Sequence, residues 1–270
     1  MELQYVWLIA TGLAAGLLGG LLGIGGSCIM IPAMVLILGT YNSVGVDQIH
    51  QYMAAAMIAN FLLALPSAVA HLRNRAVWPR VLAPLAGGAL VGIIVGVQTS
   101  YLFSNTASEY LRWALGVFFL YVAGQNAWRL RHARRSGGMP RKQVETLPVW
   151  RKLIVGVLMG LSAGLLGLGG GTLAVPAQQT FLKMPLRNSI ATSSATIAAV
   201  AWFGAILKNA QLGDNGTIWR SFMLVACIAP AAMIAAWFGG HLTHKLPLRV
   251  VRVVFIVLML ASAAKMFGLV

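Results

Sequence analysis

Two clusters of glycine residues, 144 positions apart, are where this chain could do chemistry. Each cluster is followed directly by a hydroxyl residue, Ser27 in the first and Thr172 in the second. The start of a helix carries unpaired N–H groups and a partial positive charge, and glycine has no side chain to block a ligand. Two such starts facing one cavity would bind a small anion through backbone amides, without a buried arginine. The glycines are Gly23, Gly25 and Gly26 in the first cluster and Gly167, Gly169, Gly170 and Gly171 in the second.

Polar, uncharged side chains follow each cluster and could complete an anion site. They supply hydroxyl and amide donors inside apolar segments, where hydrogen bonding between helices is the alternative role. Pro32 and Pro176 lie in the segments after the clusters and mark helix breaks. His50 could carry a proton near neutral pH. Besides Ser27 and Thr172, the expected substrate-binding residues are Gln51, Gln178, Ser193 and Ser194.

Nucleotide binding and close helix packing are the alternatives to an anion site at these glycines. The spacing argues against a dinucleotide-binding loop, because GxxGxGG is not G-x-G-x-x-G and no βαβ unit surrounds it. Close helix packing is favoured for a second set of glycines that recurs every four residues along one helix face. That set is Gly12, Gly16, Gly20, Gly156, Gly160 and Gly164. The two clusters break this rhythm, which favours binding as their role.

The acidic residues argue against several classes of protein. Glu2, Asp47, Glu109, Glu145 and Asp214 all lie in or near expected loops, so no carboxylate cluster is placed within the membrane for Na⁺ or a metal ion. We therefore expect no metal, no cofactor and no cation pumping. The apolar segments also carry no visible nucleophile–base pair, so we expect no enzymatic activity.

The composition is that of a multi-pass membrane protein. Of the 270 residues, 59% are hydrophobic and 9% are charged, against about 25% charged in a soluble domain. Apolar runs of spanning length recur along the chain. The net charge of +15 arises between these runs, where Lys and Arg act as topology signals. The expected partners are a lipid bilayer and a small anionic substrate, with no nucleic acid, and a homodimer is left open.

The chain is an internal duplication. The stretches 12–32 and 156–176 share ten identical residues, all in phase, which indicates two related halves. We predict an all-α membrane protein with a first repeat at 1–130, a linker at 131–152 and a second repeat at 153–270. Each repeat would hold two short helices, broken at the glycines, and three transmembrane helices, giving 8–10 membrane helices. The expected helices are 5–18, 28–38, 50–70, 81–99, 109–130, 153–167, 172–182, 187–207, 219–240 and 248–267.

The positions of Lys and Arg favour inverted repeats. If each short pair enters the membrane and returns, each half crosses three times, and 16 of the 20 basic residues fall on one side. If each pair crosses once, the halves are parallel and the split is 14 to 6. The more basic side is cytoplasmic. We therefore predict inverted repeats, a cytoplasmic linker at 131–152 and a site near the midplane where the repeats meet.

The doubled motif resembles that of the TauE/SafE membrane proteins, the sulfite-exporter family of the toluene sulfonate uptake permease group. The residues are GLLGGLLGIGG before Pro32, GLSAGLLGLGGG before Pro176, and RNSIATSS from Arg187 to Ser194. The resemblance covers essentially the whole chain. It implies a carrier in the bacterial inner membrane, usually an exporter, for anions such as sulfite, sulfoacetate or other organosulfonates. Ser27 stands where the second copy has Gly171, so the two half-sites are not equivalent.

The sequence as a whole predicts a secondary transporter for small sulfur-containing anions. The glycine-rich helix starts would hold the anion while the two halves rock about it. The alternative is a membrane assembly or accessory protein that transports nothing and uses its glycines for packing.

Overall fold

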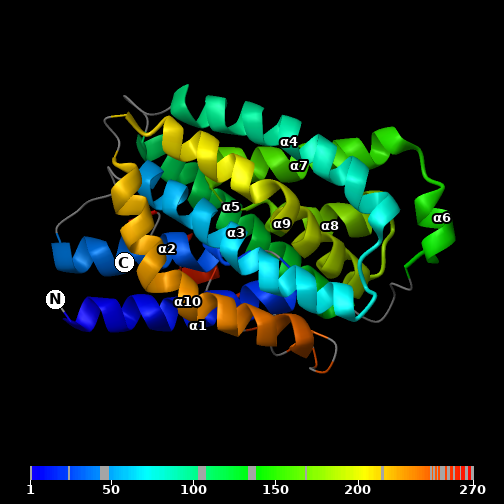
Figure 1. The fold of residues 1–270 in the computed structure, drawn as a ribbon, viewed down its shortest axis with the longest axis horizontal. Coiled ribbons are helices and arrows are strands. Elements are labelled where there is room, and N and C mark those ends of the chain that lie inside the picture. The colour runs from blue at the N-terminus through cyan, green and yellow to red at the C-terminus, as the bar shows by residue number, and fades with distance from the viewer. Residues whose placement is uncertain are drawn as a thin grey trace.

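The computed structural model is helical throughout the residues that it describes (Figure 1). These are residues 2–23, 25–42, 49–102, 108–132, 138–167, 169–213 and 216–243, with scattered residues between 245 and 268. No strand occurs among them, which confirms the all-α prediction. The expected helix 248–267 lies largely outside the described residues. The helices are α1 (Glu2–Leu22), α2 (Ser27–Asn42), α3 (Ile49–Arg73), α4 (Pro79–Leu102), α5 (Ser108–His132), α6 (Arg141–Glu145), α7 (Val149–Leu166), α8 (Gly171–Phe181), α9 (Leu186–Ala210) and α10 (Ile218–Leu242).

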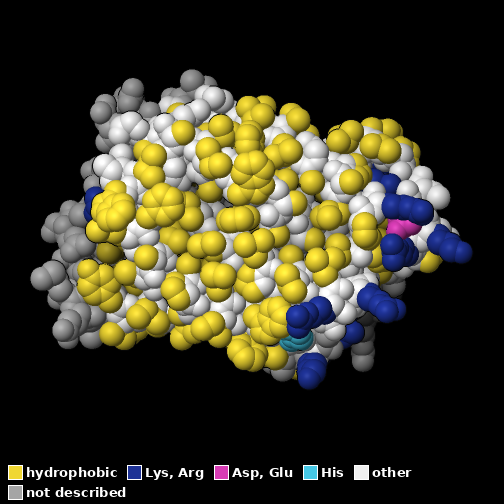
Figure 2. All heavy atoms as spheres, viewed as in Figure 1, with side chains coloured by type: hydrophobic (Ala, Val, Ile, Leu, Met, Phe, Trp, Pro, Cys, Tyr) yellow, Lys and Arg dark blue, Asp and Glu magenta, His cyan; other side chains and the backbone are white. Residues whose placement is uncertain are grey.

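Six of the described helices are long and apolar enough to cross a membrane. Their outward faces carry hydrophobic side chains, which spread over the middle of the molecule in Figure 2. A surface of this kind is stable only against lipid, so the chain is a multi-pass membrane protein, as predicted. The six segments are Tyr5–Leu22, His50–Arg73, Pro79–Tyr101, Val149–Leu166, Leu186–Ala210 and Ile218–Leu242.

Both glycine clusters interrupt the chain between two helices, as predicted. α1 ends before Gly23 and α2 begins at Ser27, while α7 ends before Gly167 and α8 begins at Gly171. The backbone is left-handed at both turns, with φ of +63° at Gly23 and +66° at Gly169. Residues other than glycine are strained in this conformation, so the turns require glycine at these positions.

Each turn joins a long helix to a short one, which corrects the prediction of two short helices. α1 has 21 residues and α7 has 18, and each contains a segment of spanning length. α2 has 16 residues and α8 has 11. The prediction ended the first helix at residue 18 because glycines follow. Gly19 and Gly20 are nevertheless helical, and Gly20 is held by close packing against α10.

The two halves pack together because the first helix of each half lies against a helix of the other half. α1 lies along α10 of the other half, α7 lies along α4, and α3 packs on α9. A Cβ atom added to Gly16 would lie 2.1 Å from the carbonyl oxygen of Ala232, and one added to Gly160 would lie 2.1 Å from that of Ala89. All six glycines of the four-residue series meet a carbonyl oxygen of the facing helix in this way. The predicted packing role of that series is confirmed.

Corresponding helices of the two halves run in opposite directions (Figure 1). α3 runs toward the end of the molecule that carries α6, and α9 runs away from it. The same holds for α10 and α4. The orientation of the halves in a membrane, and hence the inverted topology, stays a prediction, as do the repeat boundaries.

The end that carries α6 is the basic end of the molecule, where most of the Lys and Arg side chains gather in Figure 2. Glu145 holds α6 there: it accepts a hydrogen bond from Arg141 at 2.6 Å and pairs with Arg80 of α4 at 3.1 Å. The linker is therefore partly structured and tied to the start of α4.

We expect Gly160→Ala to destabilise the protein by about 1–3 kcal/mol, because the new methyl group would press on the Ala89 carbonyl. The melting temperature of purified protein in detergent measures this. Gly124→Ala is the matched control, since nothing lies within 4 Å of its added Cβ atom. Equal melting temperatures for the two variants would contradict the packing role.

Glu145 should make stability depend on pH. The Arg141 hydrogen bond, helped by Arg80, lowers the pKa of the Glu145 carboxyl below its ordinary value of 4.5. A lowered pKa in the folded protein stabilises it above that ordinary value, and the contribution is lost as the pH falls through the folded pKa. Glu145→Gln should therefore melt at a lower temperature than the parent at pH 7 and at the same temperature once the carboxyl is protonated. A gap that stays constant into strong acid would refute this.

Candidate functional site

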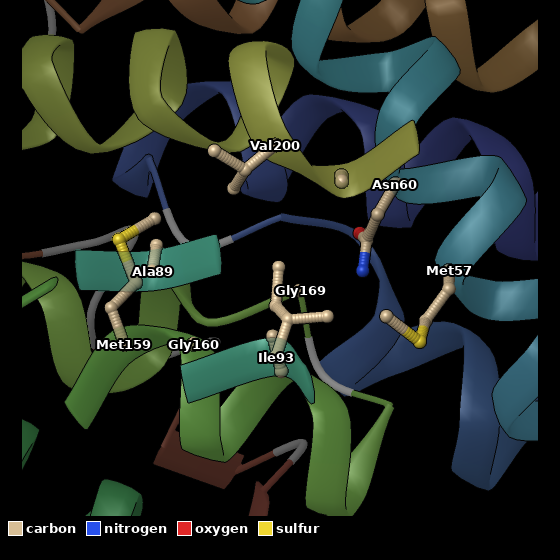
Figure 3. Close-up of a pocket in the computed structure, with 10 residues that line it drawn as sticks. Met57, Asn60, Ala89, Ile93, Met159, Gly160, Gly169 and Val200 are labelled. Atoms are coloured by element: carbon tan, nitrogen blue, oxygen red, sulfur yellow. The ribbon is translucent and has the colours of Figure 1, made fainter. Parts of the chain in front are cut away.

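Both glycine turns meet at one side chain, Asn60 of α3. A Cβ atom added to Gly25 of the first turn would lie 2.7 Å from Asn60 Oδ1. One added to Gly169 of the second turn would lie 2.3 Å from Asn60 Nδ2. Figure 3 shows the Asn60 amide pointing from α3 into the space beside Gly169. The two turns, 144 residues apart in sequence, therefore converge on a single amide group.

Asn60 caps the start of α2. Its Oδ1 accepts hydrogen bonds from the backbone N–H groups of Gly26, at 2.8 Å, and Ser27, at 3.1 Å. Its Nδ2 donates to Ser27 Oγ at 2.6 Å. Asn60 and Ser27 are both fully buried. These N–H groups are the ones that the sequence analysis assigned to an anion, and in this structure an amide oxygen occupies that place.

The start of α8 is not capped in this way. Gly170 precedes the helix with φ of +76°, and no side chain caps it among the described residues. The repeat explains the difference: Gly23 packs on Ile190 of α9, and its equivalent Gly167 packs on Met53 of α3. Ile190 of α9 and Met53 of α3 are therefore equivalent positions of the two halves. Counting seven residues on from each makes Ile197 of α9 the equivalent of Asn60 of α3. Isoleucine has no hydrogen-bonding group, so the second half has no counterpart of the Asn60 cap.

A small cavity lies beside each turn. One is lined by Asn60, Gly169, Met57 and Ile93, among others, and the other by Gly25, Gly26, Ser67 and Ser194. Each has a volume of about 10 Å³, which is room for about one water molecule. The turns are thus close together and sealed, so any larger ligand requires the helices to separate.

The structure brings some of the other predicted residues near the turns. Ser194 lines the cavity of the first turn, and Ser67 Oγ donates to Ser194 Oγ at 3.3 Å. Gln178 donates to Ser193 Oγ at 2.8 Å, about two turns along α8 from Gly171. The Gln178 Oε1 atom is buried and has no hydrogen-bond partner among the described residues. The side chain of Thr172 lies outside the described residues.

Two predicted residues lie away from the turns. Gln51 is nine residues before Asn60 on α3, about 14 Å along the helix. Its amide binds Ser221 Oγ and the backbone N–H of Thr217, which ties α3 to the start of α10. His50 precedes it and stacks on Tyr101 of α4. Pro32 and Pro176 both lie inside helices, α2 and α8, and break neither. Pro32 lacks the N–H that would bond Cys28, and a helix tolerates that loss where neighbours pack closely.

Comparison with known proteins gives the family. A family model described as "Sulfite exporter TauE/SafE" matches residues 8–266. The chain belongs to the TauE/SafE family. The fold resemblance drawn from the doubled glycine motif is thereby confirmed.

The TauE/SafE relatives are named as probable membrane transporter proteins. MamO of Magnetospirillum gryphiswaldense is 25% identical over 94% of this chain and 43% of its own length. YunE of Bacillus subtilis is 24% identical over 89% of this chain and 87% of its length, and YjnA of the same organism is 24% identical over 97% and 99%. This chain thus spans less than half of MamO but nearly all of YjnA.

Asn60 is the residue of this TauE/SafE protein that the sequence analysis did not assign to the site. A lone Asn in an apolar helix usually bonds to a neighbouring helix, so its residue type alone gives no reason to assign it to a ligand. The available signal was the asymmetry between the repeats: α3 has an amide at the position where α9 has an isoleucine.

Asn60→Ala should destabilise the protein, because two buried N–H groups would lose their acceptor, at about 1–3 kcal/mol for each group. Ser27→Ala should cost less, since it removes only the acceptor of Asn60 Nδ2. Thermal unfolding in detergent compares the two variants. The cap has no energetic importance if Asn60→Ala melts at or above the temperature of Ser27→Ala.

Proposed function

We propose that this protein is a secondary transporter that exports small sulfur-containing anions, such as sulfite or organosulfonates, and that the two glycine turns with Asn60 form its binding site. The observation that carries the proposal is the convergence of both turns on the Asn60 amide. It brings the N-terminal ends of two broken helices, one from each half, to one buried place.

The Asn60 amide oxygen supports an anion as the cargo. It accepts from two successive N–H groups at the start of α2, which is the arrangement in which a helix start binds an anion oxygen. At α8 no described side chain takes that place, so the N–H groups there are the ones available to a cargo oxygen. The Asn60 Nδ2 atom lies beside this second turn and can donate to the same ligand.

The geometry favours a group with several oxygens. The donors there are the N–H groups at the start of α8 and the Asn60 Nδ2 group beside them. Sulfite and sulfonates both present an SO₃ group, whose three oxygens can accept hydrogen bonds from separate donors. The proposal of a sulfur-containing cargo rests on this match together with membership of the TauE/SafE family.

Transport requires the site to open, because each cavity holds about one water molecule. The α3–α9 contact joins the two halves across the site. Rocking of one half against the other about this contact would separate the turns and admit the anion from one side at a time. A potential that is negative inside drives an anion outward by about 2.3 kcal/mol per charge at 100 mV, so export needs no coupled ion.

Asn60→Asp tests the proposal most sharply. Aspartate keeps an acceptor oxygen for the start of α2, and the two N–H groups favour its ionised form. Its negative charge would repel an anion from the second turn. We expect efflux of sulfite from proteoliposomes to fall at least tenfold, with a yield and melting temperature close to those of the parent.

Ser27→Ala serves as the control for this experiment, since it adds no charge. Unchanged sulfite and methanesulfonate efflux in Asn60→Asp would refute a site at the turns. Absence of any anion flux or anion-dependent stabilisation in the parent protein would favour the accessory-protein alternative.

A further inference from the structure

A buried cationic cluster lies at the end of the molecule away from α6, and the proposed site does not use it. Lys208, in the last turn of α9, has no exposed surface. Its ammonium group donates to Ser100 Oγ of α4 and lies 4.5 Å from the centre of the Tyr101 ring. Tyr101 in turn donates from its hydroxyl to the Lys208 carbonyl at 2.7 Å.

His50 completes this cluster from α3. It is 1% exposed, and its ring stacks on Tyr101 with centroids 4.9 Å apart. Neither ring nitrogen has a hydrogen-bond partner among the described residues. One of the two nitrogens is an N–H donor in either neutral tautomer. A buried donor without an acceptor is costly, so this side chain is positioned to donate to a ligand.

Among the described residues, no carboxylate balances the charge of Lys208. Its two partners, a serine hydroxyl and a tyrosine ring, are both uncharged. The one carboxylate whose contacts the structure describes, Glu145, is paired with Arg80 at the opposite end of α4, about 30 Å along that helix from Ser100. An ammonium group buried within a membrane span is costly unless it meets an anion.

The cluster stands on the same three helices as the central cavity. Asn60, Ile93 and Val200 line that cavity from α3, α4 and α9. His50, Ser100 and Lys208 lie seven to ten residues from them on the same helices, about 10–15 Å nearer the end of the bundle. A ligand at the cluster would therefore be in line with the glycine turns.

We propose that Lys208 and His50 form a second anion site, which takes one SO₃ group between α3, α4 and α9 on the path to the central site. This inference rests on the proposed function for the identity of the anion. The anion neutralises Lys208, accepts from the N–H groups that Lys208 and His50 leave unused, and passes to the turns when α3 and α9 separate.

Lys208→Met tests the second site in the full-length protein purified in detergent. Equilibrium dialysis with radiolabelled sulfite should give two bound anions per parent chain and one per Lys208→Met chain. The variant should melt at a higher temperature than the parent without sulfite, because an unbalanced charge is removed, and should be stabilised less by sulfite. Lys152→Met is the matched control: Lys152 is 3% exposed and donates to the Glu145 carbonyl at the basic end, so its loss should leave two anions bound.

The outcomes separate this inference from the proposed function. Two anions bound to Lys208→Met with unchanged affinity would overturn the second site and leave the central one standing. If Lys208→Met loses one anion but Asn60→Asp keeps both, the central site falls and the second one stands. A parent protein that binds no sulfite overturns both. His50→Gln provides the same decision if Lys208→Met does not fold: sulfite affinity unchanged within twofold overturns the second site, and a loss of tenfold or more supports it.

Discussion

The constraint on which this structure depends is that every backbone N–H group at membrane depth must find a partner inside the protein. Water is absent there, and an unpaired group costs several kcal/mol. Breaking α1–α2 and α7–α8 at glycine turns exposes such groups twice. In the first half Asn60 pairs two of them. In the second half the repeat places Ile197 at that position, and no described side chain caps the helix. The cost of the break is therefore met by Asn60 in the first half, and no described side chain meets it in the second.

Close packing makes this arrangement rigid enough to position a single amide. Glycines on α1 and α7 allow carbonyl groups of α10 and α4 to approach at distances that any side chain would prevent. Because the long helix of each half packs on the other half, the two turns are brought next to each other. The turns meet at Asn60 as a consequence of this packing, so the glycines that pack the helices and the glycines that form the turns are different residues of the same motif.

The sequence predicted the helices and the breaks between them because both depend on local signals. Apolar runs mark the spans, and glycines that depart from the four-residue rhythm mark the turns. The length of α1 was not predictable locally, since Gly19 and Gly20 stay helical only through their surroundings. Asn60 and the burial of Lys208 were missed for the same reason. The expected helix 187–207 ends just before Lys208, whereas α9 continues to Ala210 and packs that side chain against α4. The periodicity of a sequence does not show which three helices pack together, because that depends on tertiary contacts.

The duplicated halves also explain why the polar residues are unevenly distributed. The same count that makes Ile197 the equivalent of Asn60 makes Lys208 the equivalent of His71. It also makes Arg187 the equivalent of His50. A histidine and a lysine or arginine therefore stand at the ends of α3 and α9 on both sides of the molecule. At the end away from α6 both members, His50 and Lys208, are buried, whereas at the basic end His71 is buried and Arg187 is exposed. The two equivalent ends of the α3–α9 pair therefore differ in one respect: the basic residue is buried at one end and lies at the surface at the other.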